Sequence, residues 1–209
     1  QRYLEDFDYI SVRERNGQGW ISQLTDKNVE IVADPTLLVE REKWDSLVKE
    51  PDIQGDYIFF YGVPFSPETY DAVVKIGKQL SMPVIMLDAR SYIYKLNFLR
   101  GIKLYKGSSP GDYFGLIKNA NLVVTTSFHG TIFSTIFRKN FWTITFKETN
   151  MDDDRVGTLL DQLGMNDRFI FLEDIDKYDL TSDVDYTNYE RNLEPLKSKS
   201  FEFLEKALG

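Results

Sequence analysis

The sequence predicts an α/β protein with a Rossmann-like parallel sheet flanked by helices. Short apolar runs rich in β-branched and aromatic residues alternate with segments whose apolar residues recur at helical spacing, along almost all of the 209 residues. This alternation favours strand–helix–strand units, whose strands pair in parallel. Neither Gly-x-Gly-x-x-Gly after a strand nor a loop ending in Gly-Lys-Ser/Thr occurs, so binding of a dinucleotide or nucleoside triphosphate through these motifs is unsupported.

The predicted strands are short apolar runs, and several are continuous enough to be buried on both faces. Asp34-Pro35 ends the second of them, because the residue before a proline is kept out of helical geometry. The strands are predicted at 9–12, 29–33, 57–61, 84–87, 102–105, 122–124, 141–146 and 168–172.

The predicted helices begin at capping residues and end at glycine or before a loop. Ser66 and Ser109 each precede a proline, which fits the first helical turn, and Gly164 ends a helix. Asn16-Gly17 is predicted as a turn, 91–100 as a short helix or an ordered loop, and Pro195 as a kink or break. The helices are predicted at 19–26, 41–49, 66–80, 110–120, 128–137, 152–163 and 186–208.

Composition excludes several classes of protein. The chain has no cysteine, so disulfides and thiolate chemistry are absent and nothing indicates an oxidising compartment. The net charge of −8 argues against nucleic acid or an anionic membrane as a general partner, although it allows a local basic region. No apolar run is long enough to span a bilayer, and the first residues lack the pattern of a signal peptide. We therefore expect a cytoplasmic location, which includes the inner face of the membrane.

The stretch 121–138 carries the strongest functional signal. A buried strand at 122–124 is followed by three hydroxyl residues and then by an apolar helix for which Ser127 is a natural N-cap. His129, the only histidine of the chain, falls in the first turn of that helix. A helix N-terminus with hydroxyls and a histidine suits an anion, and such turns lie at the carboxyl edge of a parallel sheet, where α/β proteins bind ligands. The structural alternative is that a single histidine serves only the fold.

Four segments resemble the polysaccharide pyruvyl transferase family, in the family's order. They are ISVRE at 10–14, VADPTLL at 32–38, TSFHGTIFS at 126–134 and DRVGTLLDQLG at 154–164. Each segment alone is weak, but together they span most of the chain and are specific. The resemblance implies one half of a two-domain fold of the GT-B glycosyltransferase type: the end of a truncated first half at 1–50 and a Rossmann-like donor-binding domain with a long C-terminal helix at 51–209.

The family's reaction moves a pyruvyl group from phosphoenolpyruvate onto two sugar hydroxyls as a cyclic ketal, in the assembly of cell-surface polysaccharides. The resemblance thus implies a transferase with phosphoenolpyruvate as donor and a sugar or lipid-linked oligosaccharide as acceptor. It implies no cofactor, and we expect neither a metal site nor nucleic acid as a partner. The acidic run 152–154 is interpreted as a solvated helix cap, because consecutive residues rarely converge on one ion.

The resemblance also assigns roles to residues at the motif positions. His129 contacts the donor and acts as acid or base, and Arg13 binds its phosphate or carboxylate; the alternative for Arg13 is a surface ion pair. Arg155 is a further candidate for binding, with local pairing to the preceding acids as an equal alternative. Ser108 and Ser109 either line the donor pocket or only cap a helix. The predicted neighbours of the bound anion are Thr126, Ser127, Gly130 and Thr131.

Two other functions remain open from the sequence. The same strand, turn and helix would bind the diphosphate of a nucleotide sugar in a GT-B-type glycosyltransferase. A non-catalytic module that binds a sugar or a phosphate would also explain the polar turn.

Overall fold

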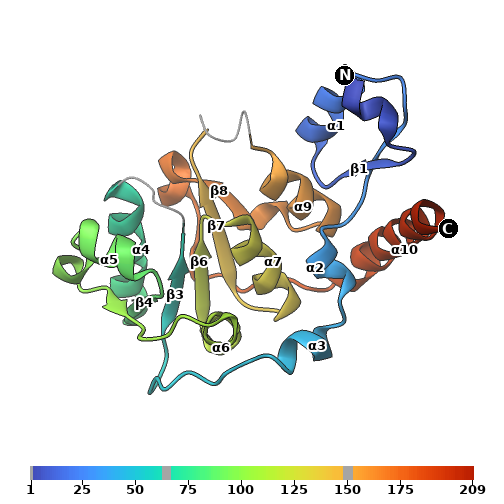
Figure 1. The fold of residues 1–209 in the computed structure, drawn as a ribbon. Helices are drawn as coiled ribbons and strands as arrows, with labels where there is room; N and C mark the ends of the chain where they lie inside the picture. Colours follow the sequence, from blue (N-terminus) through green and yellow to red (C-terminus); the bar gives the residue numbers. More distant parts are fainter. Residues whose placement is uncertain (1, 63–66, 148–152) are drawn as a thin grey trace. The chain divides into compact units, whose positions relative to one another are not determined.

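The computed structural model describes residues 2–62, 67–147 and 153–209, and its contacts divide the chain into two compact units (Figure 1). Unit 1 comprises 1–39, 147–169 and 185–209, and unit 2 comprises 40–146 and 170–184. The predicted boundary at residue 50 stays a prediction. No helix in the described part of the chain is long and apolar enough to cross a membrane.

Unit 2 contains a six-stranded sheet with the order β5-β4-β3-β6-β7-β8. The pairs β3–β4, β3–β6, β4–β5 and β6–β7 are all parallel, which confirms the predicted fold class. The strands are β3 (Ile58–Tyr61), β4 (Val84–Met86), β5 (Lys103–Leu104), β6 (Leu122–Thr125), β7 (Phe141–Thr145) and β8 (Phe169–Phe171).

Helices join these strands, as the sequence pattern predicts. The ambiguous region 91–100 folds as the end of a short helix followed by a 3-10 turn. The helical elements of unit 2 are α3 (Arg41–Asp45), α4 (Pro67–Leu80), α5 (Ala89–Tyr94), η2 (Asn97–Arg100), α6 (Pro110–Asn119), α7 (Phe128–Ile136) and η4 (Leu172–Lys177).

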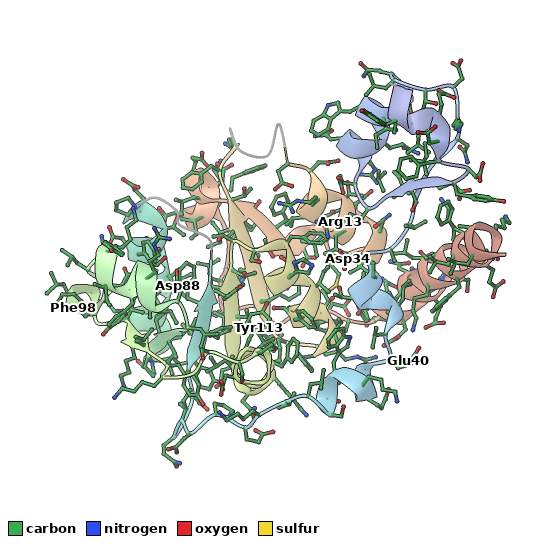
Figure 2. All side chains as sticks on the ribbon, in the orientation of Figure 1. Arg13, Asp34, Glu40, Asp88, Phe98 and Tyr113 are labelled. Atoms are coloured by element: carbon green, nitrogen blue, oxygen red, sulfur yellow. The ribbon has the colours of Figure 1, made fainter. Side chains whose placement is uncertain are left out.

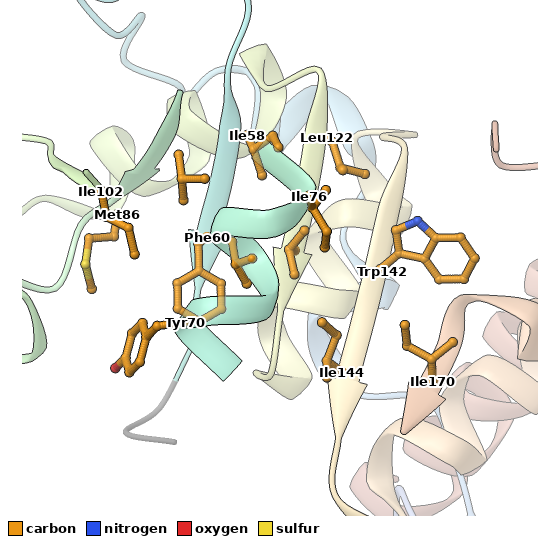
Figure 3. Close-up of a cluster of buried hydrophobic side chains, with 13 residues drawn as sticks. Ile58, Phe60, Tyr70, Ile76, Met86, Ile102, Leu122, Trp142, Ile144 and Ile170 are labelled. Atoms are coloured by element: carbon orange, nitrogen blue, oxygen red, sulfur yellow. The ribbon is translucent and has the colours of Figure 1, made fainter. Parts of the chain in front are cut away.

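Both faces of this sheet are covered by apolar side chains, since neighbouring residues of a strand point to opposite faces. On one face, Ile58 and Phe60 of β3 belong to a buried cluster with Tyr70 and Ile76 of α4 (Figure 3). On the opposite face, aromatic rings from α3, β3, α6 and α7 pack at steep angles to one another, with ring centroids 4.8–6.2 Å apart in the pairs Trp44–Phe114, Trp44–Phe133, Phe59–Tyr113 and Phe114–Phe133. The sheet therefore lies between a core on each face.

Unit 1 is built from both ends of the chain. It contains a parallel pair of strands, in which Ser11 pairs with Glu30, and helices from residues far apart in sequence. Its elements are η1 (Arg2–Asp6), β1 (Ile10–Val12), α1 (Arg15–Ser22), β2 (Val29–Ile31), α2 (Pro35–Leu38), α9 (Arg155–Leu163), η3 (Asn166–Arg168) and α10 (Tyr189–Leu208).

Three local predictions about unit 1 need correction. Asn16 and Gly17 do not form a turn but belong to the first turn of α1, because the Asn16 N–H donates to Asp154 Oδ2 (3.1 Å) and supports an earlier start of this helix. The helix α10 continues through Pro195 and is not broken there. Of the acidic run, Asp152 lies outside the described residues, and Asp154 is no solvated cap, since one of its oxygens accepts from Asn16 N and Thr158 Oγ1.

Candidate functional site

The candidate site lies where the strand order of the sheet reverses. From β3 the chain moves outward through β4 to β5, and then returns to β6 on the other side of β3 before continuing to β7 and β8. In register, Tyr61 at the end of β3 pairs with Thr125 at the end of β6. Ligands of open α/β sheets bind at such a switch point, outside the carboxyl ends of the strands. The segment with His129 leaves the sheet at this point.

The turn after β6 is held by the hydroxyl of Thr125. Thr125 Oγ1 donates to the Tyr61 carbonyl (2.5 Å) and accepts from Ser127 N (3.0 Å), while Thr126 N also donates to Tyr61 O (3.2 Å). Thr125 is fully buried. Sequence reasoning noted Thr125 only as the start of a polar run; the signal for its role is a threonine as the last residue of a buried strand.

Ser127 is the N-cap of α7, as predicted. Its backbone is extended (φ −99°, ψ 133°), and its hydroxyl accepts from Gly130 N at 3.3 Å. This cap places Phe128, His129 and Gly130 in the first turn, where the helix dipole is positive. The His129 side chain is exposed there and lies edge to face with the Phe128 ring, with centroids 5.3 Å apart.

Gly130 is required by packing. A Cβ at this position would fall far inside van der Waals contact of Thr125 Oγ1 and 3.0 Å from Thr125 Cβ. The first turn of α7 therefore lies directly against the end of β6, and only glycine allows this approach.

Thr126 carries a buried hydroxyl that is unexplained by the fold. Its Oγ1 is inaccessible to solvent and has no hydrogen-bond partner among the described residues. Gly62, directly after β3, is close to it, since a Cβ on Gly62 would lie 2.6 Å from Thr126 Oγ1. An unsatisfied polar atom at a ligand-binding edge of a sheet is consistent with a group that a ligand completes. Gly62 was missed by sequence reasoning, and its signal is a glycine that immediately follows a strand.

Three other predicted site residues have partners within unit 2. Thr131 is fully buried, and its Oγ1 lies 3.1 Å from Ser127 O and 2.7 Å from Thr143 Oγ1. Ser109 caps α6 in a reciprocal capping box with Asp112, and Ser108 N also donates to Asp112 Oδ2 (3.2 Å). Lys49 forms an ion pair with the same carboxylate, at 2.8 Å. These contacts explain Thr131, Ser108 and Ser109 structurally, and their contact with a ligand stays a prediction.

In unit 1, Arg13 follows β1 and forms an ion pair with a buried carboxylate. Arg13 Nη1 lies 2.5 Å from Asp34 Oδ2, and Arg13 Nε lies 3.7 Å from Glu14 Oε2 (Figure 2). Burial by itself raises the pKa of Asp34, but hydrogen bonds from Thr36 Oγ1 and Thr36 N, together with the Arg13 guanidinium, outweigh it and lower that pKa. Arg13 and Glu14 line a pocket of about 450 Å³, whose other walls include Leu38, Phe203 and Leu204.

Arg155 is paired in the same way. Its Nε and Nη2 donate to the two oxygens of Asp153, at 2.7 and 2.5 Å. The hydrogen bond from Arg155 is the main cause that lowers the pKa of Asp153, and the charge of Arg13 contributes in the same direction. Arg13 and Arg155 thus both lower the pKa of Asp153 in unit 1, whereas the His129 segment belongs to unit 2. No group of three or more acidic or histidine side chains in the described ranges is arranged to hold a metal ion.

Comparison with solved structures supports the fold. UDP-GlcNAc 2-epimerase from Methanocaldococcus jannaschii aligns with 14% identity over 96% of this chain and 62% of that chain, with a TM-score of 0.56. UDP-GlcNAc 2-epimerase from Neisseria meningitidis bound to UDP-GlcNAc aligns with 9% identity over 91% and 58%, with a TM-score of 0.47. The chain spans about three fifths of the length of these epimerases. At these identities the first alignment shows the GT-B-like fold alone.

The family itself is shown by the sequence. No curated protein matches the chain. The family model described as polysaccharide pyruvyl transferase matches residues 1–148, well over half of the chain. This match includes the segments with Arg13, Asp34 and His129, while the fourth resembling segment, 154–164, lies beyond it. The chain belongs to the polysaccharide pyruvyl transferase family.

Proposed function

We propose that this protein transfers a pyruvyl group from phosphoenolpyruvate to two hydroxyls of a sugar, and that unit 2 binds the donor at the first turn of α7. The observation that carries the proposal is the place of the His129 segment: it leaves the sheet at the switch point and lies within the stretch matched by the family model. The acceptor is a sugar or a lipid-linked oligosaccharide in the biosynthesis of a cell-surface polysaccharide.

The reaction sets three chemical requirements. The methylene carbon of the donor takes up a proton and becomes the methyl group, while positive charge develops at the neighbouring carbon. Two sugar hydroxyls attack that carbon in turn and each loses a proton, and the bond to the phosphate oxygen breaks. One hydroxyl proton balances the proton gained by the methyl group and the other leaves with phosphate, so no oxidant or reductant is needed.

The turn at α7 offers groups that hold the donor and move these protons. The N-terminus of α7 attracts the phosphate or the carboxylate through its positive dipole end. The buried Thr126 hydroxyl supplies a hydrogen bond that no described residue satisfies. His129 is exposed beside these groups, and an imidazole can give or take a proton near neutral pH. In this proposal His129 contacts the donor and moves the proton, while Ser127 and Gly130 hold the turn.

Arg13 and Arg155 have a different place in the proposal. Each already binds a carboxylate of unit 1, Asp34 or Asp153. A donor or acceptor that used either arginine would have to share it with that carboxylate or displace it. We therefore assign the first contact with the donor to the His129 turn and treat the two arginines as secondary binding residues.

The experiment is calorimetric titration of phosphoenolpyruvate into the chain and into two variants. His129→Ala is expected to weaken binding at least ~10-fold, which corresponds to about 1.4 kcal/mol. Lys78→Ala, an exposed cation near the end of α4, is the matched control and should bind like the parent. His129→Ala should keep the parent's melting temperature because the side chain is exposed.

The same titration separates the alternatives. Equal binding by His129→Ala and the parent would show that the donor does not bind at this turn. Binding of a uridine diphosphate sugar without any response to phosphoenolpyruvate would instead favour a glycosyltransferase. Donor binding without sugar-dependent phosphate release would leave a non-catalytic binding module.

A further inference from the structure

The segment between Asp88 and Asp112 is cationic, whereas the chain as a whole is acidic. The whole sequence carries 33 acidic and 25 basic side chains. Between these two aspartates no acidic residue occurs, and the basic residues are Arg90, Lys95, Arg100, Lys103 and Lys106. A local cationic region therefore exists in a protein whose net charge is −8.

The same segment exposes large apolar side chains. Within α5, η2 and the residues between them, the exposed fractions are 60% for Ile93, 77% for Tyr94, 50% for Leu96, 47% for Phe98 and 73% for Leu99. Figure 2 shows Phe98 at the outer edge of unit 2, on the side of α5. We call these five residues, with Arg90 and Lys95, the α5 surface.

The exposure is imposed by the fold of the segment. Asn97 is fully buried, and its Nδ2 donates to the Ser91 carbonyl at 3.2 Å, which fixes the chain between the exposed residues. Leu96 takes a left-handed conformation (φ 51°) that a leucine rarely adopts. Asp88 caps α5 by accepting from Arg90 N and from Ser91 Oγ. Because its anchors are buried, the segment presents its apolar side chains outward.

Two cations of this segment, Arg100 beside the α5 surface and Arg90 within it, are also held by contacts. Arg100 forms an ion pair with Asp71 (2.7 Å) and donates to the Lys95 carbonyl (2.8 Å). The Arg90 guanidinium lies 5.9 Å from the centre of the Tyr94 ring, which keeps an aromatic ring and a cation together. Apolar side chains flanked by cations and interfacial aromatic rings are typical of proteins that lie on an anionic bilayer.

We propose that the α5 surface binds the anionic surface of a lipid bilayer. Ile93, Leu96 and Leu99 would enter the boundary between headgroups and acyl chains, and Arg90 and Lys95 would meet lipid phosphates. Self-association through this surface is disfavoured, because a symmetric contact would bring the same cations together. The proposal goes beyond pyruvyl transfer, since the binding requires neither donor nor acceptor.

The test is sedimentation of the chain with vesicles of phosphatidylcholine alone or with about one third phosphatidylglycerol. The double variant R90Q/K95Q should lower binding to the anionic vesicles about 25-fold, at about five-fold per charge, and remove the preference for them. The double variant I93S/L99S should weaken binding to anionic vesicles while the remaining charges keep some preference for them.

Matched controls are L47S, an apolar residue of unit 2 that is 55% exposed, and K78Q on α4. Both should bind like the parent, and circular dichroism should show that all variants fold alike. The proposal is overturned if the parent does not sediment with anionic vesicles, or if both double variants bind as the parent does. It is equally overturned if light scattering shows a dimer that I93S/L99S abolishes.

Discussion

The predicted site residues of unit 1 and those of unit 2 differ in their chemical groups. In unit 1, Arg13 and Arg155 each bind a carboxylate, at 2.5 Å in both cases. In unit 2, no acidic or basic residue other than His129 occurs between Asn121 and Phe137, and the turn is organised by hydroxyls and backbone groups. The arginines of unit 1 are therefore already paired with carboxylates, whereas the candidate site of unit 2 has almost no charged side chains.

This difference predicts different costs for an incoming anion. At the arginines, a ligand competes with Asp34 or Asp153 and gains only the difference between two ion pairs. At the turn of α7, we expect it to meet a helix N-terminus and the Thr126 hydroxyl, which has no partner among the described residues. The comparison is tested by changes that disturb one group and should leave the other unaffected.

The largest effect on stability is expected from Gly130→Ala in unit 2. The added methyl group would overlap Thr125 Oγ1, so α7 has to move away from β6, at a cost of about 3 kcal/mol. Gly17→Ala in α1 of unit 1 is the control, because its Cβ would meet only the Glu14 side chain, with Oε1 at 2.8 Å, and a long side chain can move aside. Urea denaturation should show a clear loss for Gly130→Ala and a change below about 1 kcal/mol for Gly17→Ala. Similar losses in both would mean that the two regions are packed alike.

The second effect concerns the buried carboxylate of unit 1. Asp34→Ala removes the cap of α2 and the partner of Arg13, and should cost about 2 kcal/mol at pH 7. Because the pKa of Asp34 is lowered in the folded state, its contribution is complete above the ordinary value of about 3.9 and is lost as the pH falls through the lower folded value.

Urea denaturation of the parent and Asp34→Ala should therefore give a difference that shrinks on acidification below about pH 4. Glu30→Ala, an exchange of a less buried carboxylate on β2, provides the comparison. A difference between parent and Asp34→Ala that stays constant from neutral to acid pH would show that the charge of Asp34 does not stabilise unit 1.

The smallest effect separates two threonines of the His129 segment. Thr131→Val removes a hydroxyl between Ser127 O and Thr143 Oγ1 and should cost about 1 kcal/mol. Thr126→Val removes a hydroxyl without a partner in the described chain, so stability should change by less than about 0.5 kcal/mol or rise. Calorimetry should show the reverse order for phosphoenolpyruvate, with Thr126→Val the weaker binder. A larger loss of stability for Thr126→Val than for Thr131→Val would contradict the assignment.

Much of unit 2 was predictable because its signals are local. Apolar runs and helical spacing identified β3, β4, β6, β7, α4, α6 and α7, and residue type identified Ser109 and Ser127 as the caps of α6 and α7. The predicted cap of α4, Ser66, lies outside the described residues. Ser127 was recognised as a cap from its type and place, which also put His129 in the first turn of α7. A cap needs only the next three residues, so its signal survives in the sequence.

Contacts between residues far apart in the sequence were not predictable from local signals. Arg13 and Asp34 are separated by 21 positions, and Asn16 and Asp154 by 138. The start of α1 depends on the second of these contacts, and the predicted turn at Asn16-Gly17 was wrong for that reason. The exposure of the α5 surface was not predictable either. It depends on the burial of Asn97, which the local sequence does not indicate.

The sequence alone thus determined the alternation of strands and helices, the capped turn that carries His129 and, through its motifs, the family. Periodicity and capping act over a few residues, so they depend only on residues that are close in the sequence. Only the tertiary structure decided that β6 returns beside β3, which brings Tyr61 and Gly62 to Thr125 and Thr126. That pairing joins residues about 64 positions apart, and its energy comes from the completed sheet and core rather than from any local pattern.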